Sequence, residues 1–436
     1  MRQGASDASD NRRAPALGSN PSPRRWARGA AILALIGPGI MVMLADTDAG
    51  SVITAAQSGA RYRYMMVLPQ LALVPVLYLI QEMTVRLGLI TQRGHGALIR
   101  QHFGERWALL SAGTLFVACL GALVTEFAGV AGVGLLVGVP RWLSTGGAAA
   151  ALIVLVLLGR YRRIEHVGIA IGALELLFIP AAVMSHPHVA MVIHDLTHPV
   201  HVTNSFMYLL AANVGAVIMP WMIFYQQGAV VDKGRRGLNL APAIRSERLD
   251  TAVGAVVTQV IMVAIVVASA ATLGVAHAGQ SLNNVGEIAS ALTPFLGHRS
   301  AVLLFGLGMI GAAVVAVLVV TLAGAWGISE VLGWRHSLND PPARAPGFYS
   351  LAVASIALGA VLVLVAPSLV TLSVDVEVVN ACLLPIVLGF LLSLERRAIA
   401  PQWRMRGVRR AVTYTLTIAV ILFGLITTAM SLRTVF

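Results

Sequence analysis

Apolar runs long enough to cross a bilayer occur eleven times along this chain, and they limit its fold more than any other feature. A hydrocarbon core about 30 Å thick needs about 20 apolar residues in a helix. Hydrophobic residues make up 57% of the chain and charged residues 11%, which excludes a soluble globular protein. The centres of the runs lie near Ile36, Ala72, Val117, Ile153, Leu174, Val214, Ile261, Val314, Ile356, Leu384 and Ile421. Because lipid tolerates only helices and closed barrels, the runs predict an all-α polytopic membrane protein with about 11 transmembrane helices.

The basic residues are distributed unevenly between the two sides of the membrane. If the N-terminus is cytoplasmic, 26 of the 31 Lys and Arg residues fall on the cytoplasmic side. The five exceptions are Arg61, Arg63, Arg141, Arg299 and Arg433. The positive-inside rule therefore predicts an inner-membrane protein with a cytoplasmic N-terminus and an extracytoplasmic C-terminus. The net charge of +12 then reflects topology, and no nucleic-acid partner is expected.

Neither the N-terminal segment nor the cysteines suggest another structural class. Residues 1–28 are rich in Ser, Asn, Pro and Arg, so we expect a disordered cytosolic tail. No cleavable signal peptide is visible. Cys119 and Cys382 lie singly within apolar segments, which argues against a disulfide framework and against a cysteine metal site.

Two of the apolar runs, the first and the sixth, are interrupted at membrane depth. The first contains the polar segment 46–51, and the sixth contains the segment 215–220. Gly50 frees the backbone in one, and Pro220 removes a helical donor in the other. Unwound backbone at this depth must line a cavity inside the protein. Breaks five spans apart predict an inverted repeat over 29–190 and 191–398 around a midplane site, with a peripheral eleventh span in 399–436.

The first break holds the strongest candidate for a functional residue. Asp48 lies beside Gly50, and a carboxylate at membrane depth is costly and usually functional. Its oxygens and the carbonyl of Ala45 would suit a cation, although Asp48 could instead cap a helix. Asp46 is either an acid that orients Asp48 or a structural residue. Ser51 would bind the ion directly or through water, or would form only a local turn.

The second break adds ligands of a different kind. Met219 offers a thioether and Ala216 a backbone carbonyl. Together with a carboxylate, such a set suits borderline-soft divalent metals better than Ca²⁺. A methionine in an apolar helix is more often a packing residue, but the position of Met219 directly before Pro220 favours a ligand role.

These residues carry a resemblance to the Nramp family of divalent-metal transporters. Residues 37–39 read Gly-Pro-Gly and residues 48–51 read Asp-Ala-Gly-Ser, close to the family's GPG and DPGN signature of the first helix. Segment 215–220 resembles the signature of the sixth helix, which ends in MPH. Further similarity lies at Glu126-Phe127 and at Thr321-Leu322-Ala323-Gly324. The resemblance implies a LeuT-type fold with broken helices 1 and 6, and metal coordination by Asp48, Ala216 and Met219.

The departures from the family pattern concern coupling and site size. Ala49 and Ser51 replace the Pro and Asn of DPGN, which predicts a roomier site. The family's proton-handling positions are Trp221, Gln226 and Leu123 here, and none of these side chains titrates usefully. This pattern is similar to the divergent prokaryotic branch of the family associated with Mg²⁺ transport. All eleven histidines lie in loops or at span ends, so no other imidazole replaces those that are missing.

Several polar residues have weaker assignments. Asn213 would contact a partly hydrated ion or, more simply, bond one helix to another. Asp375, Glu377 and Asn380 in the tenth span would line the pathway or a gate. Two further intramembrane acids, Glu82 and Glu175, would pair with polar neighbours. An outer loop would collect metal or be merely solvated, and it contains His186, His188, His194, Asp195, His198 and His201.

Together these features predict a secondary transporter that imports Mg²⁺ or Mn²⁺ without proton coupling. A proton-coupled Mn²⁺ or Fe²⁺ importer is the alternative, favoured by Met219 and Glu126 and opposed by Trp221 and Leu123. A sodium-coupled carrier of an organic solute ranks third, because a substrate carboxylate would be repelled by Asp48. No nucleophile-base pair or HExxH motif suggests an enzyme. We expect no resident cofactor, a divalent metal ion as substrate, the lipid bilayer as surroundings and plausibly a monomer.

Overall fold

A computed structural model describes residues 38–158, 161–198, 202–233, 240–276, 282, 284–290 and 297–435 of the 436-residue chain. Within these residues the regular structure is helical throughout, with no strand. The helices are α2 (Pro38–Asp46), α3 (Ala49–Tyr62), η1 (Arg63–Met66), α4 (Val67–Thr91), α5 (His95–Phe103), α6 (Glu105–Leu136), α7 (Arg141–Leu158), α8 (Tyr161–Gly172), η2 (Ala173–Leu177), α9 (Phe178–Met184), α10 (Val189–Thr197), α11 (Asn204–Val217), α12 (Pro220–Asp232), α13 (Leu240–Ala276), α14 (Val285–Ser290), α16 (His298–Leu332), α17 (Pro346–Val365), α18 (Leu369–Arg397) and α19 (Gly407–Val435).

The predicted spans agree closely with these helices. Ten stretches of the described chain are long and apolar enough to cross a membrane, and all predicted centres from Ala72 onward fall within them. The predicted tail 1–28 and the first centre, Ile36, lie outside the described residues. The described part of the first span consists of α2 and α3, which flank Thr47 and Asp48. One departure from expectation is that α3, η1 and α4 follow one another without a loop, over Ala49–Thr91.

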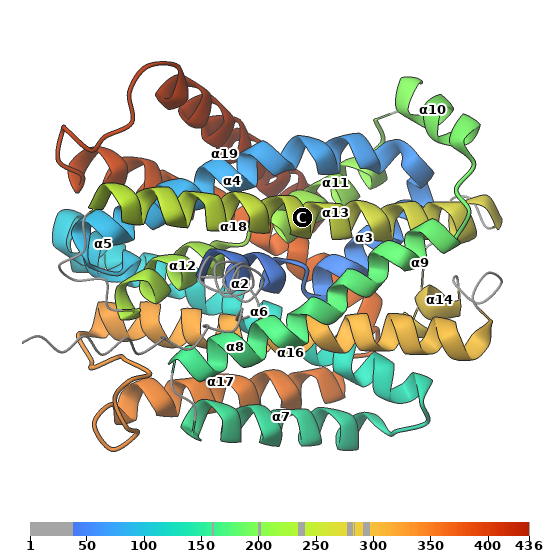
Figure 1. The fold of residues 1–436 in the computed structure, drawn as a ribbon, viewed down its shortest axis with the longest axis horizontal. Coiled ribbons are helices and arrows are strands. Elements are labelled where there is room, and N and C mark those ends of the chain that lie inside the picture. Colours follow the sequence, from blue (N-terminus) through green and yellow to red (C-terminus); the bar gives the residue numbers. More distant parts are fainter. Residues whose placement is uncertain are drawn as a thin grey trace, which may run out of the picture. The chain divides into compact units, whose positions relative to one another are not determined.

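Both predicted breaks are present, and both lie in the core. The first separates α2 from α3 at Thr47 and Asp48, and the second separates α11 from α12 at Ile218 and Met219. Pro220 occupies the first turn of α12, where its missing N–H costs no helical hydrogen bond. Figure 1 shows α2 and α12 among the surrounding long helices.

The long helices pack in pairs around the two broken ones. α6 lies against α16, α3 against α13, and α11 against α18. The α3–α13 approach is close because Gly59 has no side chain: a Cβ there would overlap the carbonyl of Val266. α19 packs on α18 and α4, and most of its apolar window is not buried inside the protein. The boundaries of the two repeats stay a prediction.

Candidate metal-binding site at the two helix breaks

Asp48 is the N-cap of α3 and is completely buried. Its backbone is extended, with φ −68° and ψ 172°, and its Oδ1 accepts a hydrogen bond from the backbone N–H of Ser51 at 2.6 Å. Capping of this kind satisfies one of the free donors at a helix start. Oδ2 has no hydrogen-bond partner among the described residues. The capping alternative therefore explains one oxygen of this carboxylate and leaves the other for a ligand or for a protonated neighbour.

The two breaks contact one another directly. The hydroxyl of Ser51 donates to the carbonyl oxygen of Ala216 at 3.0 Å, so an oxygen group of the first break meets one of the second. Ala45, at the end of α2, and Met219, at the start of α12, are fully buried. The backbone of Met219 is extended, with φ −87° and ψ 138°. All five predicted ligand residues thus lie within or next to the two breaks.

Glu126 joins the first break from α6. Its Oε2 accepts a hydrogen bond from the backbone N–H of Ala49 at 3.0 Å, which satisfies a second free donor at the start of α3. Its carboxyl group also lies within hydrogen-bonding reach of that of Asp48. Two carboxyl groups share a hydrogen bond only when one of them carries a proton. Glu126 is therefore placed to exchange a proton or to approach the same ion as Asp48.

Glu377 of α18 lies against both breaks, a position that its sequence spacing did not specify. A Cβ added to Gly50 would overlap its carboxylate, and a Cβ added to Gly215 would overlap its backbone carbonyl. Oε2 accepts a hydrogen bond from Asn380 at 3.0 Å, whereas Oε1 has no partner among the described residues. Asn380 orients Glu377 through this bond. In the sequence, the only signals for this position of Glu377 were the glycines of the two breaks, Gly50 and Gly215, and the presence of an acid inside an apolar run.

Two further acids lie beside the first break. Asp46 ends α2, has Thr258 of α13 next to its carboxylate, and is buried. The hydroxyls of Thr47 and Thr258 are in contact. Glu175 lies in η2, the 3₁₀ turn within the fifth span, with its carboxylate next to Thr47. Glu175 therefore lies next to a polar neighbour, as the sequence predicts, and that neighbour belongs to the break itself.

The break region therefore concentrates negative charge without ionic compensation. Five buried acids surround it: Asp46, Asp48, Glu126, Glu175 and Glu377. None takes part in an ion pair found within the described chain. Buried carboxylates need a cation or a proton. No three His, Cys, Asp or Glu side chains of the described residues lie close enough to enclose a metal, so an ion here must also use carbonyl, hydroxyl or thioether ligands.

The positions that distinguish this chain from the family pattern serve as packing residues. Trp221 is fully buried in the core, and Leu123 packs against Gly359 of α17. Gln226 donates a hydrogen bond to Thr251 at 3.0 Å, about two turns along α12 from the break. Asn213 donates to Ser58 at 2.7 Å and so ties α11 to α3, which favours its helix-to-helix alternative.

One histidine is more buried than its place at a helix end suggests. His95 begins α5, contacts Gln227 of α12 at 3.0 Å and is almost completely enclosed. Burial lowers the pKa of His95 to about 4, so the ring is neutral at neutral pH. In the outer segment, Asp195 is held by Arg63 at 3.0 Å and His194 stacks on His198. His201 lies outside the described residues.

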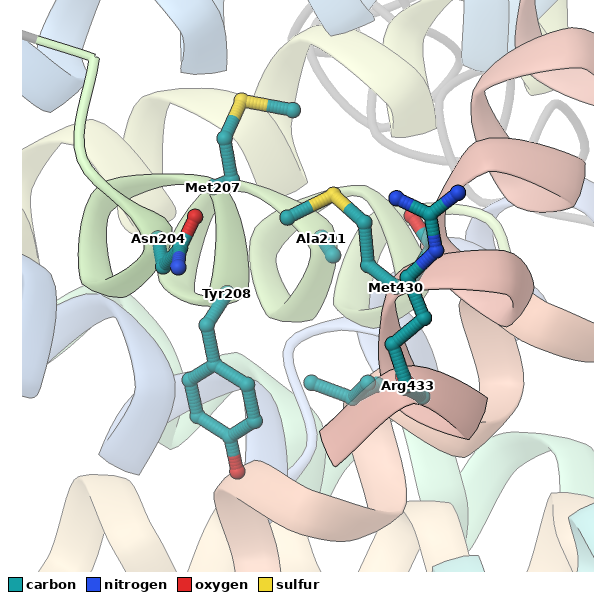
Figure 2. Close-up of a pocket in the computed structure, with 9 residues that line it drawn as sticks. Asn204, Met207, Tyr208, Ala211, Met430 and Arg433 are labelled. Atoms are coloured by element: carbon teal, nitrogen blue, oxygen red, sulfur yellow. The ribbon is translucent and has the colours of Figure 1, made fainter. Parts of the chain in front are cut away.

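A pocket of about 360 Å³ lies to one side of the breaks. Figure 2 shows it between α11 and the end of α19, with Met207, Tyr208, Met430 and Arg433 around it. The Tyr208 hydroxyl contacts Asp375 of α18. The pocket contains none of the predicted ligand residues, so it is distinct from the candidate metal site.

Gly215→Ala should lower both the stability and the transport activity, because the new methyl group would meet the Glu377 backbone. Overpacking of this kind costs about 1 to 3 kcal/mol. The matched control is Gly146→Ala in α7, where a Cβ has no neighbour within 4 Å. Alanine is the better helix former at both positions, so equal melting temperatures in detergent would contradict the close approach.

Similar solved structures show which class of protein has this fold. A mutant of the Eremococcus coleocola manganese transporter superposes with a TM-score of 0.73 at 18% identity, over 94% of this chain and 88% of that one. A Na⁺-coupled sialic acid symporter gives a TM-score of 0.59 at 12% identity, over 91% and 89%. The fold is therefore the LeuT-type fold of membrane transporters. The profile of the family described as natural resistance-associated macrophage protein-like (Nramp) matches residues 39–430, and the chain belongs to this family.

Sequence relatives agree with this membership. The divalent metal cation transporter MntH of Aeromonas hydrophila is 26% identical over 303 residues, covering 67% of this chain and 72% of the relative. The MntH of Pediococcus pentosaceus is 28% identical over 247 residues, which is 54% of each chain. The chain thus aligns with between about half and three quarters of the length of these two relatives.

Proposed function

We propose that the protein carries divalent metal ions across the membrane, with Asp48, Ser51, Ala216, Met219 and the Ala45 carbonyl as ligands. The observation that carries this proposal is the buried Asp48 carboxylate at the first break, whose capping partner Ser51 also contacts the Ala216 carbonyl of the second break. A buried carboxylate of this kind must be neutralised by a cation or by a proton. The MntH relatives, named as divalent metal cation transporters, support the substrate class.

The surroundings of the breaks favour Mg²⁺ and Mn²⁺ as substrates. Carboxylate, hydroxyl and carbonyl oxygens outnumber the single thioether, and hard ions prefer oxygen ligands. Ser51 is shorter than the amide of the family signature, which leaves room for an ion that keeps some water. Met219 adds affinity for Mn²⁺. The deciding measurement is uptake of Mg²⁺, Mn²⁺ and Ca²⁺ into proteoliposomes, and uptake of none of them would refute the proposal.

Met219→Ala should reduce the affinity for Mn²⁺ and Cd²⁺ more than the affinity for Mg²⁺. A thioether contributes to soft ions and little to a hydrated hard one. Competition of each ion with Mn²⁺ uptake measures the change, with Met207→Ala in the lateral pocket as the matched control. An equal loss for all ions would mean that Met219 only packs.

Influx is proposed to proceed without proton cotransport. The positions that handle protons in the family are Trp221, Gln226 and Leu123, and the contacts of all three are those of packing or hydrogen-bonding residues. A proton-coupled importer is the second candidate. It is favoured by one specific observation, the contact between the carboxyl groups of Glu126 and Asp48.

The proposed setting is the plasma membrane, with the N-terminus in the cytoplasm as the basic residues predict. Membership of a transporter family and the absence of a catalytic motif from the sequence support transport over catalysis. The ion is the substrate, so no resident cofactor is part of the proposal.

A further inference from the structure

A pocket lined by five arginines lies away from the helix breaks. It has a volume of about 370 Å³. The arginines come from three helices and one loop, and they are Arg86 of α4, Arg248 of α13, Arg404 and Arg406 of the α18–α19 loop, and Arg409 of α19. No acid lines the pocket among the described residues. The positive-inside rule predicts only that these residues lie on the cytoplasmic side of the membrane.

Two buried carboxylates behind the pocket neutralise part of this charge. Glu82, which we expected to pair with polar neighbours, does so with Arg248 at 2.7 Å, with Arg86 at 3.8 Å and with Arg409. Glu395 lies 3.4 Å from Arg86. Arginine stays protonated in proteins, so two carboxylates cannot balance five guanidinium groups. The excess positive charge favours the binding of an anion.

The remaining two arginines belong to a loop held in a fixed shape. Arg404 donates to the Ile399 carbonyl at 2.8 Å, and Arg406 donates to the Pro401 carbonyl at 3.0 Å. Arg86, almost completely buried, donates to the Trp403 carbonyl at 3.1 Å and fixes the loop to α4. These guanidinium groups are therefore arranged before any ligand arrives, which lowers the entropic cost of binding.

The start of α19 adds to the positive potential. α19 begins at Gly407, between the pocket residues Arg406 and Arg409, and the first N–H groups of a helix carry partial positive charge. A planar guanidinium group can donate two parallel hydrogen bonds to two oxygens of one phosphate. On the predicted topology, the pocket also lies at the depth of the inner-leaflet headgroups, where basic pockets between helices bind anionic lipids.

We propose that this pocket binds a phosphate group, carried by an anionic phospholipid headgroup or by a small soluble phosphate ester. The bound phosphate neutralises the arginines and joins the peripheral α19 to α4 and α13. This proposal does not depend on which ion the protein transports. Its ligand should raise the melting temperature of the folded protein.

The test uses the purified full-length protein in non-ionic detergent. Melting temperatures are measured against dioctanoylphosphatidylglycerol, dioctanoylphosphatidylcholine and glycerol 3-phosphate. We expect the anionic lipid to stabilise the protein and the zwitterionic lipid to have no comparable effect. Stabilisation by glycerol 3-phosphate as well would identify a soluble phosphate ester as a ligand, and its absence would identify the lipid.

Variants test whether the stabilising ligand binds in the arginine pocket. In Arg404→Gln/Arg406→Gln, the concentration that gives half of the maximal stabilisation should rise at least about tenfold, because charge-assisted bonds are lost. Arg406→Gln alone serves if the double variant does not fold. Arg106→Gln/Arg335→Gln removes the same charge from exposed residues outside the pocket and should change nothing. Stabilisation by both lipids alike, by no phosphate compound, or with equal weakening in the control would overturn the proposal.

Discussion

Replacing Asp48 with asparagine should abolish metal transport while leaving the fold intact. Asparagine is at least as good a helix cap as aspartate, so the bond from the Ser51 N–H to the side chain is kept. What disappears is the charge beside the Ser51–Ala216 contact. Loss of a residue that only supports a metal ligand costs about 10- to 100-fold, so loss of the charged ligand should cost at least about 100-fold. Mn²⁺ and Mg²⁺ uptake into proteoliposomes measures the effect.

Comparing Asp48→Asn with Asp48→Ala separates a role in metal binding from a role in helix capping. Asp48→Ala removes both the charge and the cap, so it should lose transport and also some stability, by about 1 kcal/mol. Glu105→Ala serves as the control, because Glu105 is an exposed acid at the start of α6, away from the breaks. If Asp48→Asn transports normally and only Asp48→Ala is impaired, Asp48 is a cap and the site assignment fails.

Metal influx should proceed without movement of protons, although acids surround the breaks. Coupling needs a titratable group that changes its protonation state between the two faces of the membrane. A divalent ion gains about 4.6 kcal/mol per 100 mV of inside-negative potential, twice the value for a single charge. This driving force is sufficient for the uptake of an abundant ion such as Mg²⁺.

The measurement is made in proteoliposomes that contain a pH-sensitive dye, with a metal gradient and a clamped membrane potential. We expect metal uptake with no change in luminal pH. Acidification that scales with uptake would establish the proton-coupled importer instead. In that case Glu126→Gln should separate the two processes, because Glu126 contacts Asp48 and is the acid best placed to carry the proton.

The helical architecture and the two breaks follow from local sequence. The bilayer imposes the length of each span, so apolar runs identify helices without any knowledge of their packing. Pro220 and Gly50 identify the breaks for an equally local reason, because they change what the backbone can do. Asp48 and Met219 could be singled out since they lie in those breaks.

The partners of the breaks were decided only by the tertiary structure. Glu377 and Glu175 lie on helices remote in sequence, and their approach depends on which faces of α18 and η2 turn inward. A hydropathy pattern shows that a helix crosses the membrane, but it does not show how the helix is rotated or which helices lie beside it. Those features are set by helix packing. The arginine pocket has the same origin. The sequence assigned its five arginines to one side of the membrane, but only the packing of α4, α13 and α19 brought their charges around Glu82.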